Sequence, residues 1–206
     1  MSTFRTAAPV IPCKESPVCR CLLEAMGEKR RLCRFYQEAA RRLEAEGLLV
    51  IAHAFRFTAA QEEEHAAVLE CLLTARGGTL PPAGDEQAPP SSPIELLRAA
   101  AAAEHNAWDE RYPHYIRTAR AEGCLRAAGA LERIAETDHL HAMRFVQYMT
   151  ALADGSLLQD PQRISWVCLA CGQLHTGCEP PASCSGCSGG PGHFIRTSFY
   201  PFSVEA

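Results

Sequence analysis

The sequence Glu62-Glu63-Glu64-His65 is matched in the second half of the chain by Asp138-His139-Leu140-His141. Each stretch places a carboxylate three residues before a histidine, a spacing that brings the two side chains to one face of a helix. A lone glutamate precedes each carboxylate by the same interval, Glu28 in the first half and Glu104 in the second. This internal repeat predicts two similar helical hairpins with the same potential metal ligands.

Two tyrosines and two Glu-Gly pairs keep the same offset: Tyr36 with Tyr112, and Glu46-Gly47 with Glu122-Gly123. A glycine after a helical run is typical of a helix C-terminus. Four helical segments that supply four carboxylates and two imidazoles match the requirement of a two-iron or two-manganese site in a four-helix bundle. A single Glu-x-x-His is common on charged helices, so the prediction depends on the repetition.

A competing register exists in the second half, where Glu136 and His139 also form Glu-x-x-His. We reject this register because its counterparts in the first half, Ala60 and Glu63, do not form the pair. Asp138 is therefore the predicted ligand, although its side chain is one methylene shorter than that of glutamate.

The tyrosines lie eight residues after the lone glutamates, from Glu28 to Tyr36 and from Glu104 to Tyr112. Eight residues leave two side chains about 80° apart around an α-helix. We therefore expect a one-residue π-bulge between glutamate and tyrosine in both halves. The tyrosines would then hydrogen-bond ligand carboxylates, and the alternative is a purely structural place in the core.

Length, charge and hydropathy limit the class of protein. A chain of 206 residues can hold a bundle of about 150 residues and a small appended module. The net charge is -4, and the absence of a long Lys/Arg run argues against a nucleic-acid partner. The N-terminus has no signal-peptide core, and no apolar run approaches the roughly 18 residues of a membrane helix. We expect a cytoplasmic protein that does not contact membranes.

The pattern of helical and turn-forming residues divides the chain. We expect an N-terminal tail (1–17), an all-α four-helix bundle (18–155) and a metal-held C-terminal module (164–206). Residues 76–93 contain five prolines and no helical periodicity. Such a long connector inside a bundle suggests a crossover between the two hairpins.

Five of the eleven cysteines fall within twenty residues near the C-terminus. Cys168-x-x-Cys171 and Cys184-x-x-Cys187 form two metal knuckles, and four thiolates make a tetrahedral site for iron or zinc. Cys178 falls outside this spacing, so we interpret it as a spare thiol.

The remaining cysteines are scattered, with Cys13, Cys19 and Cys21 grouped near the N-terminus. An odd cysteine count without an export signal favours reduced thiols over a disulfide framework. No fourth ligand for a metal is evident near these three residues. We interpret them as free thiols, with a further metal or redox cluster as the alternative.

Taken together, these motifs resemble the rubrerythrin family over about residues 20 to 196. The matching stretches in the bundle are Gly27-Glu28, Gln61-Glu62-Glu63-Glu64-His65-Ala66, Glu104-His105, Tyr112-Pro113 and His141-Ala142-Met143-Arg144-Phe145. The C-terminal run from Trp166 through both knuckles to Phe194 resembles the rubredoxin-like tail of the family. The resemblance implies a ferritin-like bundle with a non-haem di-iron site, followed by a small rubredoxin-like β module.

The resemblance also implies the ligands and the reaction. Two iron ions would be held by Glu28, Glu62, His65, Glu104, Asp138 and His141. A further iron would be held by Cys168, Cys171, Cys184 and Cys187. The family reduces hydrogen peroxide to water with electrons from an NADH-dependent reductase or a rubredoxin, and its members usually form homodimers or larger assemblies. Our candidate catalytic residues are Glu28, Glu62, Glu104, Asp138, Tyr36 and Tyr112.

Three positions depart from the family pattern, and they keep alternatives open. Asp138 replaces the usual glutamate ligand. Ala107 replaces a further glutamate that takes over one iron on oxidation, so the resemblance implies that iron stays on His65 in both redox states. Arg31, the repeat counterpart of Ala107, either brings a cation near Glu28 or lies exposed. The alternatives are a ferroxidase or oxygen-reducing di-iron protein and a non-enzymatic zinc- or iron-binding protein.

Overall fold

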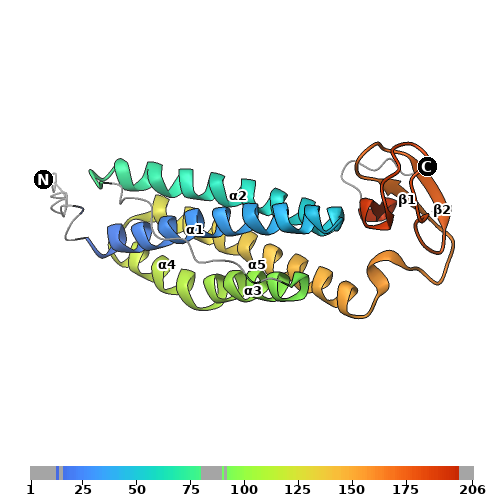
Figure 1. Ribbon diagram of the computed structural model, residues 1–206. Helices are drawn as coiled ribbons and strands as arrows, with labels where there is room; N and C mark the ends of the chain where they lie inside the picture. The colour runs from blue at the N-terminus through green and yellow to red at the C-terminus, as the bar shows by residue number, and fades with distance from the viewer. Residues whose placement is uncertain (1–12, 14–15, 80–89, 91, 200–206) are drawn as a thin grey trace, which may run out of the picture.

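The computed structural model describes residues 13, 16–79, 90 and 92–199, and it shows an elongated helical bundle with a small module at one end (Figure 1). The first hairpin consists of α1 (Pro17–Ala45) and α2 (Leu49–Thr74). The second pairs α5 (Leu125–Ala153) with a rod made of α3 (Pro93–Asn106), the π-helical turn η2 (Ala107–Arg111) and α4 (Tyr112–Ala121). This arrangement confirms the expected all-α four-helix bundle.

Local sequence signals determine where the helices begin. The side chains of Ser16 and Ser92 each accept a hydrogen bond from a backbone N–H in the first turn, of α1 and α3 respectively. Proline follows each serine, at Pro17 and Pro93, where its missing N–H has no cost and its fixed φ suits the helix.

The two Glu-Gly pairs form matching corners at the ends of α1 and α4. Gly47 has φ +76° and Gly123 has φ +70°, in the left-handed region that favours glycine. The backbone N–H of Leu48 donates to the carbonyl of Leu43 at 2.8 Å, which closes the end of the first helix. The repeat in the sequence therefore corresponds to a repeated turn in the structure.

The helices that flank the predicted connector end and begin in different parts of the bundle. Helix α2 ends at the end of the bundle that is remote from the C-terminal module, whereas α3 begins toward the module (Figure 1). Most of the predicted connector, residues 80–89 and 91, lies outside the described residues.

The π-helical turn occurs in only one of the two hairpins. The backbone N–H of Tyr112 donates to the carbonyl of Ala107, five residues earlier, and Pro113 follows directly. Helix α1, in contrast, is a continuous α-helix from Pro17 to Ala45. The prediction of a π-bulge is confirmed for residues 104–112 and wrong for residues 28–36. In the second half, the π turn therefore adds one residue between the helix that carries the predicted ligand and the tyrosine. The first half has no such extra residue.

The apolar core of the bundle is divided into two clusters. One contains Leu22, Met26 and Leu69, and the other is centred on Phe55 and Phe145. The bundle also buries several polar and charged side chains, which come from α1, α2, α3 and α5. Such groups are stable away from water only when they are paired or bind a metal.

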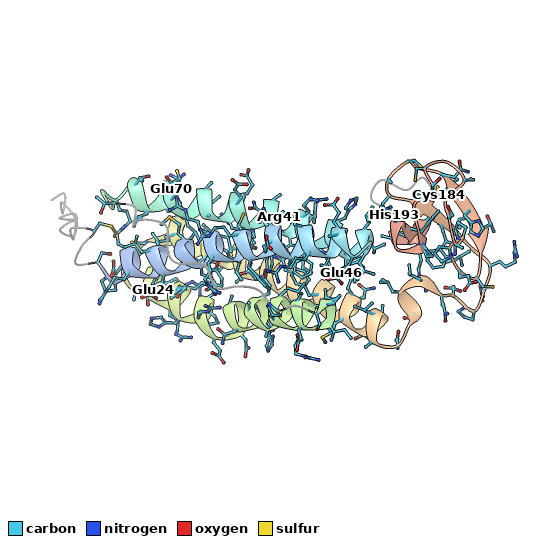
Figure 2. All side chains as sticks on the ribbon, in the orientation of Figure 1. Glu24, Arg41, Glu46, Glu70, Cys184 and His193 are labelled. Carbon is cyan, nitrogen blue, oxygen red and sulfur yellow. A yellow bond between two sulfur atoms is a disulfide. The ribbon has the colours of Figure 1, made fainter. Side chains whose placement is uncertain are left out.

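The C-terminal module is a three-stranded antiparallel sheet in the order β2-β1-β3. Its strands are β1 (Ile164–Cys168), β2 (Leu174–Gly177) and β3 (Phe194–Arg196). Trp166 is fully buried, and its indole N–H donates to the carbonyl of Gly177 at 3.0 Å. Cys184 and His193 lie in this module, beyond Glu46 at the end of α1 (Figure 2).

The module packs directly on the end of the bundle. Val50 of α2 forms a small apolar cluster with Val167 and Ile195 of the module. A Cβ added at Gly192 would overlap the carbonyl oxygen of Gly47. The close approach of the two backbones therefore requires glycine at position 192. Among the described residues, no helix is both long and apolar enough to cross a membrane.

Near the N-terminus, Cys13 and Cys19 form a disulfide, so the interpretation of both as free thiols is wrong. The backbone N–H of Ser16 donates to the carbonyl of Cys13, and the Cα atoms of the two cysteines are 5.5 Å apart. That separation lies within the range that a disulfide can bridge. Cys21 is a buried free thiol, as expected.

Candidate metal centres

Four buried side chains from three helices form the centre of the bundle: Glu62 on α2, Glu104 on α3, and Asp138 and His141 on α5. Potential ligand atoms of these residues all lie within 4.8 Å of one another. Glu104 Oε2 and His141 Nδ1 have no hydrogen-bond partner in the described part of the chain. Buried carboxylates and an imidazole with free ligand atoms are a suitable donor set for iron.

His141 is held in the orientation of a ligand. Its Nδ1 lies 3.2 Å from Glu62 Oε1 and 3.4 Å from Glu104 Oε1, while its Nε2 lies 3.0 Å from Gln61 Oε1. Burial lowers the pKa of His141, but the nearby carboxylates of Glu104 and Glu62 outweigh burial and raise the pKa to about 9. A metal bound at Nδ1 would replace the proton that this nitrogen otherwise carries. Sequence analysis missed Gln61, because its repeat counterpart, Thr137, has no amide.

His65 lies at the edge of the cluster. Its Nδ1 is 3.3 Å from Glu62 Oε1 and 3.8 Å from Asp138 Oδ1, and 15% of its side chain is exposed. The imidazole rings of His65 and His141 are 6.0 Å apart between centroids. The two Glu/Asp-x-x-His pairs therefore converge on one site, as the repeat predicts.

Glu28 does not join the cluster. Its carboxylate pairs with Arg31, at 3.2 Å, and with Arg111 of the π-helical turn. Arg31 thus places a cation near Glu28, one of the two interpretations of that residue. The structure brings together the other five predicted bundle ligands without Glu28.

Lys29 lies where a ligand from α1 would be expected. Its Nζ is 2.6 Å from both carboxylate oxygens of Asp138, 2.7 Å from Glu62 Oε2 and 3.7 Å from Glu104 Oε2. Burial lowers the pKa of a lysine, but the acidic groups around Lys29 outweigh burial and hold its pKa well above the usual value. One signal could have revealed this residue: Lys29 lies seven residues, close to two helical turns, before Tyr36.

The two tyrosines have different partners. The hydroxyl of Tyr36 donates to Glu104 Oε1 at 2.7 Å, and burial and this carboxylate raise the pKa of Tyr36 well above its usual value. The hydroxyl of Tyr112 is also buried, yet it has no hydrogen-bond partner among the described residues. Only Tyr36 is thus placed to orient a carboxylate of the cluster.

The four knuckle cysteines form a second cluster in the C-terminal module. The sulfur atoms of Cys168 and Cys187 are 3.7 Å apart, and those of Cys171 and Cys184 are 3.6 Å apart. Tetrahedral coordination with metal–sulfur bonds of about 2.3 Å requires a separation of about 3.8 Å, so the cluster fits one metal ion.

Backbone hydrogen bonds favour the thiolate form at one of these cysteines. The N–H of Gly186 lies 3.4 Å from Cys184 Sγ, and it contributes most to lowering the pKa of Cys184 to about 7. Cys178 is an exposed free thiol outside this cluster, as expected.

Comparison with known proteins agrees with these centres. A family model described as Rubrerythrin matches residues 25–149. The chain is 33% identical over 187 residues to a rubrerythrin of Porphyromonas gingivalis. The aligned region covers 86% of this chain and 89% of that protein. It is 34% identical over 157 residues to a rubrerythrin of Nitratidesulfovibrio vulgaris, with coverage of 72% and 78%.

A solved structure of fully reduced nigerythrin has the same fold, with a TM-score of 0.63 and 22% identity over 94% of this chain and all of that chain. Rubrerythrins have both a di-iron centre and a rubredoxin-like iron site. The carboxylate–histidine cluster lies where the first is expected, and the four cysteines suit the second. The family model, the identities and the two donor clusters agree: this chain belongs to the rubrerythrin family.

Proposed function

We propose that this protein reduces hydrogen peroxide to water as a defence against oxidative stress. One observation supports this function above others: a single chain combines a buried carboxylate–histidine cluster and a four-cysteine cluster, both suited to iron. A purely structural role for the bundle metal would not require a second iron-type site. An oxidoreductase uses the second site to supply electrons to the first.

Iron bound at the two clusters would supply the electrons for the reduction of peroxide, with the four-cysteine site as a one-electron relay. The protein's own residues position that chemistry. Glu62, Glu104, Asp138 and His141 would hold metal in the bundle, and Tyr36 orients Glu104 through its hydrogen bond. The apolar clusters of the bundle core limit the access of bulk water.

The position of the module supports electron transfer between subunits. The module packs at the α1–α2 corner, next to Glu46, whereas Lys29 marks the level of the carboxylate cluster on α1. At a rise of about 1.5 Å per residue, the path along the helix from Lys29 to Glu46 is about 25 Å long. Because electron transfer slows steeply with distance, we expect a homodimer or larger assembly in which one subunit's module lies near the bundle site of another.

The external donor in this proposal is an NADH-dependent reductase that acts directly or through a rubredoxin. We expect the protein to act in the cytoplasm. Its partners are peroxide, the donor and further copies of the same chain, without nucleic acid or membrane.

The decisive experiment is stopped-flow absorbance on the iron-loaded, anaerobically reduced protein mixed with stoichiometric hydrogen peroxide. The ferric-thiolate bands of the four-cysteine site should return much faster with peroxide than with dissolved oxygen. A Glu104→Gln variant, which retains the cysteine site, should lose the fast phase. Equal rates in the variant and the parent protein would show that the bundle site is not used.

One observation favours a second candidate, a ferroxidase or oxygen-reducing protein. Ala107 is buried and offers no oxygen ligand, so the donor set lacks an extra carboxylate in the π-helical turn. Faster return of the bands with oxygen than with peroxide would support this candidate. A colourless protein with zinc bound by the cysteines would instead support a non-enzymatic metal-binding role.

A further inference from the structure

Lys29 is a fully buried cation surrounded by the three carboxylates of the bundle site. Lysine is almost never fully buried unless it is paired. Here the pairing is to the same groups that would bind metal, with Asp138 and Glu62 oxygens at 2.6 and 2.7 Å. The ammonium therefore competes with metal for these oxygens.

The one-sided π-helical turn identifies Lys29 as the structural counterpart of Glu104. Seven residues of regular α-helix connect Lys29 to Tyr36, and eight residues that include the π turn connect Glu104 to Tyr112. The extra residue of the π turn accounts for the difference. Position 29, and not position 28, thus corresponds to the glutamate ligand of the second half.

The tyrosines support the same correspondence. Tyr36 of the first half donates to Glu104 of the second half. By the symmetry of the repeat, Tyr112 would donate to a carboxylate at position 29. Lysine is a donor and offers no acceptor, its Nζ lies 5.8 Å from the centroid of the Tyr112 ring, and the Tyr112 hydroxyl has no partner among the described residues.

We propose that the bundle site of this protein binds one metal ion, held by Glu62, Glu104, Asp138 and His141, and that the ammonium of Lys29 takes the place of the second. The free ligand atoms agree with this assignment. Lys29 lies closer to one side of the site, with its Nζ 2.6 Å from Asp138 and 2.7 Å from Glu62 but 3.7 Å from Glu104 Oε2. Glu104 Oε2 and His141 Nδ1 have no hydrogen-bond partner within the described residues. His65 then hydrogen-bonds Glu62 and is not needed as a ligand.

Charge balance favours a single divalent ion. The site contains three carboxylates, and Glu28 is paired with Arg31 and Arg111 outside it. One ammonium and one divalent ion neutralise three carboxylates. A second divalent ion would leave two uncompensated positive charges in a buried site, which is strongly unfavourable.

The test is the number of iron ions per chain, measured without peroxide, so its result is independent of the proposed function. The full-length protein is loaded anaerobically with excess Fe(II), desalted and analysed by plasma mass spectrometry. The iron bound by the cysteines is counted separately from its ferric-thiolate absorbance. We expect one further iron per chain in the bundle, and two would overturn the proposal.

Two variants make the test specific to Lys29. Lys29→Glu supplies the missing carboxylate, and we expect the number of bundle irons to double. Glu28→Gln is the matched control at the neighbouring position and should leave the number unchanged. A folded Lys29→Glu protein with one bundle iron, or a loss of bundle iron in Glu28→Gln, would contradict the assignment.

Crystallography keeps the proposal testable if Lys29→Glu does not fold. Anomalous diffraction at the iron edge from the loaded parent protein should show one peak in the bundle, beside Glu104 and His141. Two peaks, with Lys29 displaced from Asp138, would show that the lysine does not occupy a cation position.

Discussion

Tyr36 on α1 donates a hydrogen bond of 2.7 Å to Glu104 on α3, and so connects the two hairpins at the centre of the bundle. Its repeat counterpart, Tyr112, is equally buried but has no such partner among the described residues. The two tyrosines of the repeat thus differ in their hydrogen-bond partners. Tyr36 and Tyr112 can therefore be compared directly by replacing each with phenylalanine.

Tyr36→Phe should weaken both folding and metal binding, because a buried carboxylate loses its donor. We expect a loss of about 1–3 kcal/mol in the free energy of unfolding. Metal affinity should fall by about 10- to 100-fold. Chemical denaturation and metal titration measure the two effects. Tyr112→Phe removes a hydroxyl without a described partner and should change little, so equal losses in both variants would refute the assigned role of Tyr36.

Lys29→Met should destabilise the metal-free protein, because it leaves three buried carboxylates without their ammonium. Removal of one partner from a buried ion pair costs about 3–5 kcal/mol. Urea unfolding in the presence of a chelator measures this loss. Arg31→Met, which breaks the more exposed pair with Glu28, is the control and should cost less than about 1 kcal/mol. Similar midpoints for Lys29→Met and the parent protein would be inconsistent with the buried pairing.

The stability of the metal-free protein should depend on the protonation of His141. The pKa of His141 is about 9 in the folded protein, above the ordinary value of 6.5, so folding favours the protonated form. This contribution, up to about 3 kcal/mol, is fully present below pH 6.5 and is lost as the pH rises through 9. His141→Gln should remove this part of the pH dependence. If the free energy of unfolding changes with pH in the same way for His141→Gln and the parent protein, the raised pKa would be contradicted.

Cys184→Ser should abolish the ferric-thiolate absorbance, because it removes one of the four sulfur ligands. The far-ultraviolet circular dichroism of the bundle should remain. Cys178→Ser is the matched control, since this exposed cysteine is outside the cluster and its loss should leave the absorbance intact. Loss of the bands in both variants would indicate a different set of ligands.

Gly192→Ala should loosen the module from the bundle, because the new Cβ would overlap the carbonyl oxygen of Gly47. Overpacking of this kind costs about 1–3 kcal/mol. Faster proteolysis between residues 154 and 164 measures the loosening. Gly190→Ala is the control, because a Cβ there meets nothing within 4 Å. Unchanged proteolysis of Gly192→Ala would show that the contact does not hold the module.

The sequence predicted most of the bundle and most of its central cluster. The spacing of three residues in Glu62–His65 and Asp138–His141 is local to a helix, and therefore it survives into the structure. The cysteine knuckles are equally local, and their sulfur atoms converge as predicted.

The prediction of Glu28 followed from the constant offset between the two halves of the repeat. That offset holds after the π-helical turn but not before it, because the turn adds one residue to the second half alone. Helical periodicity counted back from Tyr36 leads to Lys29 instead. The Cys13–Cys19 disulfide joins a residue before the first helix to a residue in its first turn, and such a pair has no periodic signal in the sequence.

A chelator can remove a metal ion from a protein, but it cannot remove a side chain. The counterion at Lys29 is covalently tethered to α1, so part of the negative charge at the centre of the bundle stays neutralised when iron is scarce. The helices can therefore assemble before iron arrives and persist after it leaves. The fold of this chain therefore does not depend on the supply of the metal that its chemistry requires.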